Sequence, residues 1–177
     1  MDFWHVKNNK IVNNWVMVDF PDVMNQLGVD VFEGEGWEKF GNKKNKSQCY
    51  LDQNQIEDFI YRITYEIWEN KKVENIRKYY AKDVIVRSPS ITTFDCDKVV
   101  EATYKTLNQV PDRELIGEDV ISCGSIDQTY LSSHRILSTG THIGEGVYGK
   151  PTGRKVIYRV IADCLVKDNK VIEEWII

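Results

Sequence analysis

The chain has 177 residues, 42% of them apolar and 28% charged, which is enough for one packed domain and a remainder. Its net charge of -4 gives no general attraction to nucleic acid or to anionic membranes. Four scattered cysteines, no apolar stretch near the ~20 residues of a membrane span and no signal-peptide pattern predict a cytoplasmic protein with neither nucleic-acid nor membrane partners.

The first part of the chain predicts a β-hairpin followed by one short helix. Two β-prone runs, 3–6 and 11–20, flank an Asn-Asn turn signal. Residues 22–27 suit a short helix, with Gly28 as its C-terminal cap. Residues 33–54 mix glycine with a Lys/Asn cluster and have little apolar patterning, which is typical of a linker.

From residue 55 the pattern predicts helices first and strands afterwards. Isoleucine and aromatic residues recur at three- and four-residue spacing from Ile56 to Trp68, which gives a helix with one apolar face. The further expected helices are 73–80 and 97–107, and the expected strands are 84–87, 114–122, 128–142, 154–166 and 170–177. This order favours an α+β fold, with helices on one face of a curved antiparallel sheet whose other face is free to line a pocket.

The two ends of the chain resemble each other. Residues 3–15 align without gaps on residues 163–175, at a constant offset of 160. The residues with identical partners are Val6, Lys7, Asn9, Lys10 and Trp15. The shared element is a strand–turn–strand with a tryptophan at one fixed place, and chance similarity of two hairpins is the alternative explanation.

Three motifs in the second half resemble a known family. They are TGTHIGE at 139–145, PTGR at 151–154 and KVIEEW at 170–175, in that order. Together they are similar to the SnoaL-like polyketide cyclase (ester cyclase) family of the nuclear transport factor 2-like superfamily. The resemblance implies three segments: residues 1–32 as the C-terminal hairpin and short helix of a first copy, 33–54 as a linker, and 55–177 as a nearly complete second copy.

The resemblance implies a cone-shaped fold with a buried apolar pocket for a small hydrophobic molecule, often in a homodimer, and no metal or organic cofactor. In the polyketide cyclases of this family an Asp in the final strand is the acid/base of an intramolecular aldol closure, with a His nearby. Asp19 and His5 match these catalytic positions. In the second copy Leu165 replaces the His, and the sequence stops before the counterpart of Asp19.

Each candidate also has a structural interpretation. Asp19 could instead cap a strand end, and His5 could be an ordinary strand residue. Candidate ligand-binding residues, which could equally be hydrogen-bonded turn, strand or core residues, are His142, Asp163, His134, Trp68, Tyr65 and Tyr104.

Two functions remain open at this stage. One is a cofactor-free cyclase or isomerase that uses an Asp acid/base on a hydrophobic carbonyl substrate. The other is a non-catalytic ligand-binding or dimerisation module, which the loss of the His in the second copy favours. Converging ionisable side chains in the cavity would favour the enzyme. A lone two-stranded hairpin is marginal in water, so we also expect residues 3–18 to pair with a sheet edge of the same or a partner chain.

Overall fold

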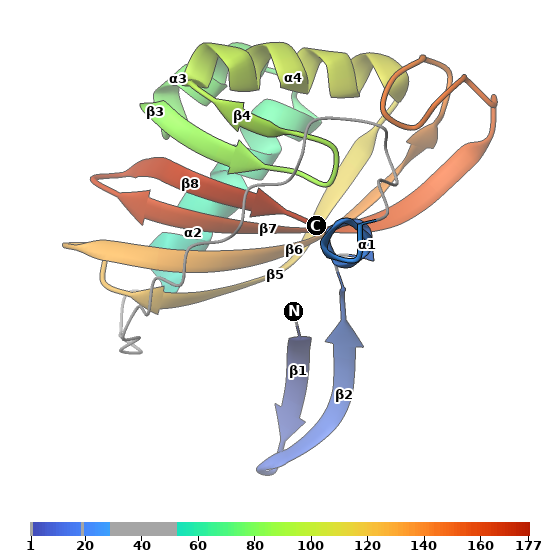
Figure 1. Ribbon diagram of the computed structural model, residues 1–177. Coiled ribbons are helices and arrows are strands. Elements are labelled where there is room, and N and C mark those ends of the chain that lie inside the picture. Colours follow the sequence, from blue (N-terminus) through green and yellow to red (C-terminus); the bar gives the residue numbers. More distant parts are fainter. Residues whose placement is uncertain (1, 19, 29–52) are drawn as a thin grey trace.

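The computed structural model describes residues 2–18, 20–28 and 53–177, and it is an α+β fold as expected (Figure 1). One curved six-stranded sheet carries helices on its inner face. In spatial order its strands are β4 (Thr92–Phe94), β3 (Tyr80–Arg87), β8 (Lys170–Ile176), β7 (Lys155–Lys167), β6 (Thr129–Thr141) and β5 (Glu114–Gly124). The helical elements are α2 (Gln53–Ile63), η1 (Thr64–Glu69), η2 (Val73–Asn75), α3 (Ile76–Tyr79) and α4 (Cys96–Gln109).

The sheet differs from the expectation in one pairing. Strands β3 and β8 run parallel, whereas every other neighbouring pair is antiparallel. Parallel neighbours need a long connection between them. Here that connection is the segment from β4 through β7, so β8 enters the middle of the sheet beside a strand that precedes it by more than eighty residues.

Helix α2 and the π-helical η1 form because their apolar residues share one face. Ile56, Ile60, Ile63 and Ile67 are all buried, at spacings of four, three and four residues. Burying one such side chain stabilises the fold by roughly 1.5–3 kcal/mol. The expected linker, 33–54, lies outside the described residues except for its last two, which begin α2.

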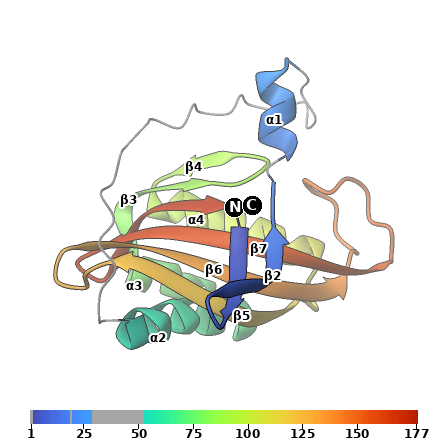
Figure 2. The ribbon, with the colours of Figure 1, turned by 90° about the horizontal axis from the view of Figure 1, so that it is seen from below.

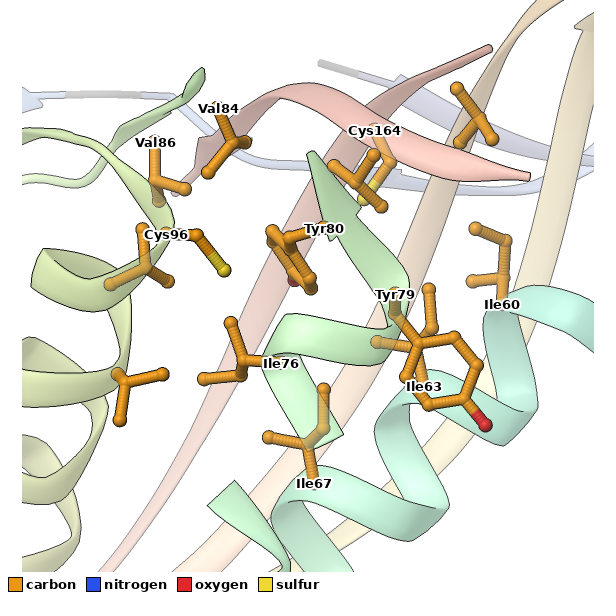
Figure 3. Packing of buried hydrophobic residues seen from close by; sticks show 14 of the residues in the cluster. Ile60, Ile63, Ile67, Ile76, Tyr79, Tyr80, Val84, Val86, Cys96 and Cys164 are labelled. Atoms are coloured by element: carbon orange, nitrogen blue, oxygen red, sulfur yellow. The ribbon is translucent and has the colours of Figure 1, made fainter. Parts of the chain in front are cut away.

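The core lies between the helices and the inner face of the sheet (Figure 3). Tyr80, at the start of β3, lies between Cys96 of α4 and Cys164 of β7, with Ile76 beneath it. The N-terminus of α4 is capped by the Asp95 side chain, which accepts a hydrogen bond from the Asp97 N–H at 2.7 Å.

The connection between β6 and β7 folds back onto the end of α4. The N–H groups of Ile143 and Gly144 donate to the Gln109 carbonyl at 3.0 and 3.1 Å. A Cβ on Gly144 would lie 2.2 Å from the Asn108 carbonyl oxygen, so no larger residue fits there. This close approach gives a physical reason for the second glycine of the TGTHIGE motif.

Strands β1 (Asp2–Lys7) and β2 (Lys10–Val16) form a hairpin of their own, followed by helix α1 (Phe20–Gln26). In the described part of the chain this hairpin does not pair with an edge of the six-stranded sheet; it lies across the outer face instead (Figure 2). Phe3 is buried there, and the Trp15 ring centre is 4.1 Å from the guanidinium carbon of Arg135 on β6. The outer face therefore buries the Phe3 ring and half-buries that of Trp15.

The hairpin has the same geometry as β7–β8. Phe3 pairs with Trp15 as Asp163 pairs with Trp175, and a bulge follows two residues later in both. Both turns have two residues with positive φ, Asn8-Asn9 in one and Asp168-Asn169 in the other. The offset of 160 thus holds for register, bulge and turn.

Across the described ranges, no helix is long and apolar enough to cross a membrane.

Candidate functional site

A cavity of about 580 Å³ opens on the inner face of the sheet, between α4, η1 and strands β3, β4 and β8. A cavity of this size suits a small organic molecule. Its apolar walls include Ile67, Trp68, Phe94, Val99 and Ile176. The sheet face that lines the pocket is thus the helix-covered one, not the opposite face that the sequence left open for this role.

Two glutamates line this cavity, Glu101 and Glu174. Glu101 is exposed on α4 and pairs with Lys98, so Glu174 is the buried one of the two. Glu174 is 7% exposed and lines the cavity. Adjacent residues of a strand face opposite sides of a sheet, so Glu174 and Glu173 point to different faces. On the other side, Glu173 pairs with Arg87 at 3.2 Å. Inside, the Tyr80 hydroxyl donates to Glu174 Oε2 at 3.0 Å, and Cys164 Sγ lies 3.8 Å from Oε1.

Burial raises the pKa of Glu174 to about 7, because the charged form loses its hydration. Hydrogen bonds from Tyr80 and Cys164 oppose this by stabilising the carboxylate, and the charge of Asp163 adds to the rise. Glu174 is therefore divided between acid and carboxylate near neutral pH. Burial also raises the pKa of Tyr80 well above its ordinary value, which keeps its hydroxyl protonated and able to donate.

Of the aromatic residues expected at a ligand site, Trp68 lines the cavity. Tyr104 is on the exposed side of α4, where its hydroxyl donates to Glu74 at 3.1 Å. Tyr65 is 61% exposed and borders a separate surface depression beside Tyr61. The structure therefore does not bring these three residues together.

His134 is buried beneath α2, on the inner face of β6. Its Nδ1 is 3.1 Å from Thr64 Oγ1, and the Tyr61 ring meets it edge to face at 5.1 Å. Burial lowers the pKa of His134 to about 4, so the imidazole is neutral at physiological pH. His142 is buried in the β6–β7 connection, with Nδ1 3.4 Å from Thr152 Oγ1. Neither histidine is among the residues that line the Glu174 cavity.

Of the remaining candidates, the structure places Asp163 and His5 away from the inner face. Asp163 is on the outer face of β7, cross-strand from Ser133, and burial raises its pKa to about 6 although a hydrogen bond from Ser133 lowers it. His5 is exposed on β1, and Asp19 lies outside the described residues. In the described ranges no group of three or more His, Cys, Asp or Glu side chains is arranged to hold a metal ion.

Sequence reasoning passed over Glu174 and Tyr80. A signal was available, because two adjacent glutamates on a strand within a covered sheet must place one carboxyl group on each face. The periodicity does not show which of the two faces inward, since a bulge at Ile172 of β8 shifts the register with β7.

A model of the SnoaL-like polyketide cyclase family matches residues 58–177. The chain belongs to this family. The match covers all of the six-stranded sheet and most of α2, and it leaves out the N-terminal hairpin. No protein of curated function matches the sequence significantly.

Solved structures of the SnoaL-like family and its superfamily share the fold. A candidate SnoaL-like polyketide cyclase from Jannaschia sp. CCS1 is 16% identical, with a TM-score of 0.60 over 73% of this chain and 89% of that chain. IdmH, a candidate polyketide cyclase from Streptomyces antibioticus, is 23% identical (TM-score 0.55; 70% and 91% covered). AclR, a candidate hydroxylase from Streptomyces galilaeus, is 22% identical (TM-score 0.57; 71% and 79% covered). At these identities the likeness concerns the fold alone.

Proposed function

We propose that the domain of residues 55–177 binds a small hydrophobic carbonyl compound in the inner cavity and catalyses its cofactor-free cyclisation or isomerisation, with Glu174 as acid/base. The observation that carries this proposal is the buried Glu174 carboxyl group, held by Tyr80 in the wall of an otherwise largely apolar cavity. An acid/base catalyst works best when its pKa lies near the working pH, and the Glu174 pKa of about 7 meets that condition.

The chemistry follows from these two groups. The Glu174 carboxylate removes a proton from the carbon beside a carbonyl and leaves an enolate. In a cyclisation the enolate carbon forms a bond with a second carbonyl carbon, and the protonated Glu174 returns its proton to the new alkoxide. In an isomerisation the proton returns to a different carbon. The Tyr80 hydroxyl holds the carboxyl group in one orientation throughout.

Proton removal can be measured without knowing the natural substrate. We expect the protein to accelerate exchange of the α-protons of β-tetralone in deuterium oxide, followed by NMR. Glu174→Gln should lower the exchange rate on the order of a hundredfold or more. The rate should rise with pH through about 7, as the carboxylate forms. Tyr80→Phe should move this midpoint upward, because it removes the hydrogen bond that stabilises the carboxylate.

The neighbouring carboxylate supplies the matched control. Glu173 is on the opposite face in an ion pair with Arg87, so Glu173→Gln should exchange at the wild-type rate. Equal losses in the Glu173 and Glu174 variants, or no acceleration by the wild type, would refute the assignment of Glu174.

The earlier candidates Asp19 and His5 belong, in this proposal, to the first copy of the repeat. Since His5 is exposed on β1 and is not among the residues that line the cavity, His5→Ala should leave β-tetralone exchange unchanged. Of the candidate ligand-binding residues, we propose that Trp68 contacts the ligand, because it lines the same cavity as Glu174.

A second candidate function is a dimerisation module, and the hairpin favours it. Its face away from the sheet exposes four apolar residues, Trp4, Val6, Ile11 and Val16. Their counterparts at the offset of 160 are Cys164, Val166, Val171 and Ile176, of which the first three are buried and the last lines the cavity. We propose that a second copy of the chain covers this exposed face in a homodimer.

A further inference from the structure

Arg113 is a buried cation at one end of the cone. It precedes β5 and is only 6% exposed. Its Nε donates to Ser138 Oγ at 2.9 Å. The guanidinium carbon is 4.9 Å from the Trp68 ring centre and 5.3 Å from that of Tyr158. These contacts fix the plane of the guanidinium but do not neutralise its charge.

The other arginines of low exposure have carboxylate partners. Arg87 pairs with Glu173 at 3.2 Å, and Arg135 pairs with Glu118 at 2.9 Å. Arg113 has no ion pair within the described residues, and its one side-chain hydrogen bond there is that from Nε to Ser138 Oγ. Burial lowers the pKa of Arg113, and only the hydroxyls of Tyr158 and Tyr148 oppose the shift. An uncompensated buried charge is costly, so its presence calls for a partner that binds from outside the chain.

A second polar group beside Arg113 also lacks a partner. The Tyr158 hydroxyl is buried, with no hydrogen bond in the described structure. Tyr158 is cross-strand from Ser138, the residue that holds Arg113 Nε. Buried polar groups are usually hydrogen-bonded, so the unsatisfied Tyr158 hydroxyl beside a cation without an ion pair indicates an acceptor that both could share.

Trp68 links Arg113 to the cavity. Its ring contacts the Arg113 guanidinium, and the same side chain lines the cavity that contains Glu174. We propose that Arg113 and Tyr158 form a recognition site for a carboxylate group, carried by a ligand whose apolar body occupies the cavity beside Trp68. This site deepens the proposed function and rests on it, because it names the substrate class as a hydrophobic carboxylic acid. A planar guanidinium matches the two oxygens of a carboxylate.

The test compares a naphthoate with the matching neutral naphthamide, by calorimetric titration of the full chain. The wild type should bind naphthoate about tenfold or more tightly than the amide, as expected for a charged hydrogen-bonded pair. Arg113→Met should abolish this preference and leave amide affinity unchanged. Tyr158→Phe, which removes one oxygen only, should reduce the preference partly.

Equal affinity of the wild type for the two ligands, or a preference that survives in Arg113→Met, would overturn the carboxylate site while leaving the cavity intact. Failure of both ligands to bind would contradict the cavity itself, and this site with it. The two failures are therefore distinguishable.

Thermal stability gives a readout that needs no ligand. A cation held for a ligand destabilises the empty protein, so Arg113→Met should keep or raise the melting temperature. Arg135→Met is the matched control, because it breaks the ion pairs with Glu118 and Asp119 and should lower the melting temperature. A fall in Arg113→Met as large as that in Arg135→Met would make Arg113 a structural residue and refute the proposal.

Discussion

At the scale of single residues, two buried carboxyl groups on neighbouring strands make the stability of the protein depend on pH. Burial raises the pKa of Glu174 to about 7 and that of Asp163 to about 6, against unfolded values near 4.3 and 3.9. Between its unfolded and folded pKa, each group binds more protons in the folded state. Their contribution to stability is therefore complete at acid pH and is lost as pH rises through the folded pKa.

We expect Glu174→Gln to flatten this dependence. In the wild type the Glu174 contribution should fall by about 3 kcal/mol between pH 4.5 and 7.5, since each pKa unit corresponds to about 1.4 kcal/mol. The difference in unfolding free energy between variant and wild type, from urea denaturation, should grow in favour of the variant over this range. A difference that stays constant with pH would show that Glu174 titrates normally.

At the scale of elements, much of the architecture could be predicted from local patterns. The isoleucine spacing identified α2 and its buried face, and the run of β-prone segments identified the sheet. The partner of each strand could not be predicted as well, because the β3–β8 contact joins residues far apart in sequence. The lack of an ion pair at Arg113 could not be predicted either, since it depends on which side chains from distant parts of the sequence surround the guanidinium.

Two residues of helix η1 test the prediction that α2 and η1 share one buried apolar face. Ile67 is 1% exposed and belongs to the core, so Ile67→Ala should lower the unfolding free energy by about 2–5 kcal/mol. Tyr65, two residues before it, is largely exposed, and Tyr65→Ala should change stability by about 0.5 kcal/mol or less. Chemical denaturation measures both, and similar losses in the two variants would place the apolar face elsewhere on the helix.

At the scale of the whole molecule, the hairpin β1–β2 covers the outer face of the sheet and exposes its own second face. Phe3 and the Trp15–Arg135 contact attach it to the sheet, whereas Trp4, Val6, Ile11 and Val16 face away. The shared register with β7–β8 supports our proposal that residues 1–32 are the last part of a first copy. An exposed apolar strip of this kind is a candidate contact between two copies in a two-fold pair.

We expect the chain to be a dimer by light scattering coupled to size exclusion. Replacing Val6 and Ile11 together by lysine should give a monomer, because two charges would be buried in the contact. As a control, replacing Lys7 and Lys10 together by alanine leaves the apolar strip intact, and this variant should remain dimeric. A monomeric wild type, or a dimer that tolerates the two lysines, would contradict this contact.

The position of β8 has a consequence for how the protein is made. Strands β3 and β4 can join the β5–β7 half of the sheet only through β8, which lies between β3 and β7. While a ribosome has released the chain only as far as β7, the two halves of the sheet are present with no strand to connect them. Their unpaired edges then need protection until β8 emerges, so the release of Lys170–Ile176 from the ribosome, rather than the folding of any single helix, sets the moment at which the cone closes.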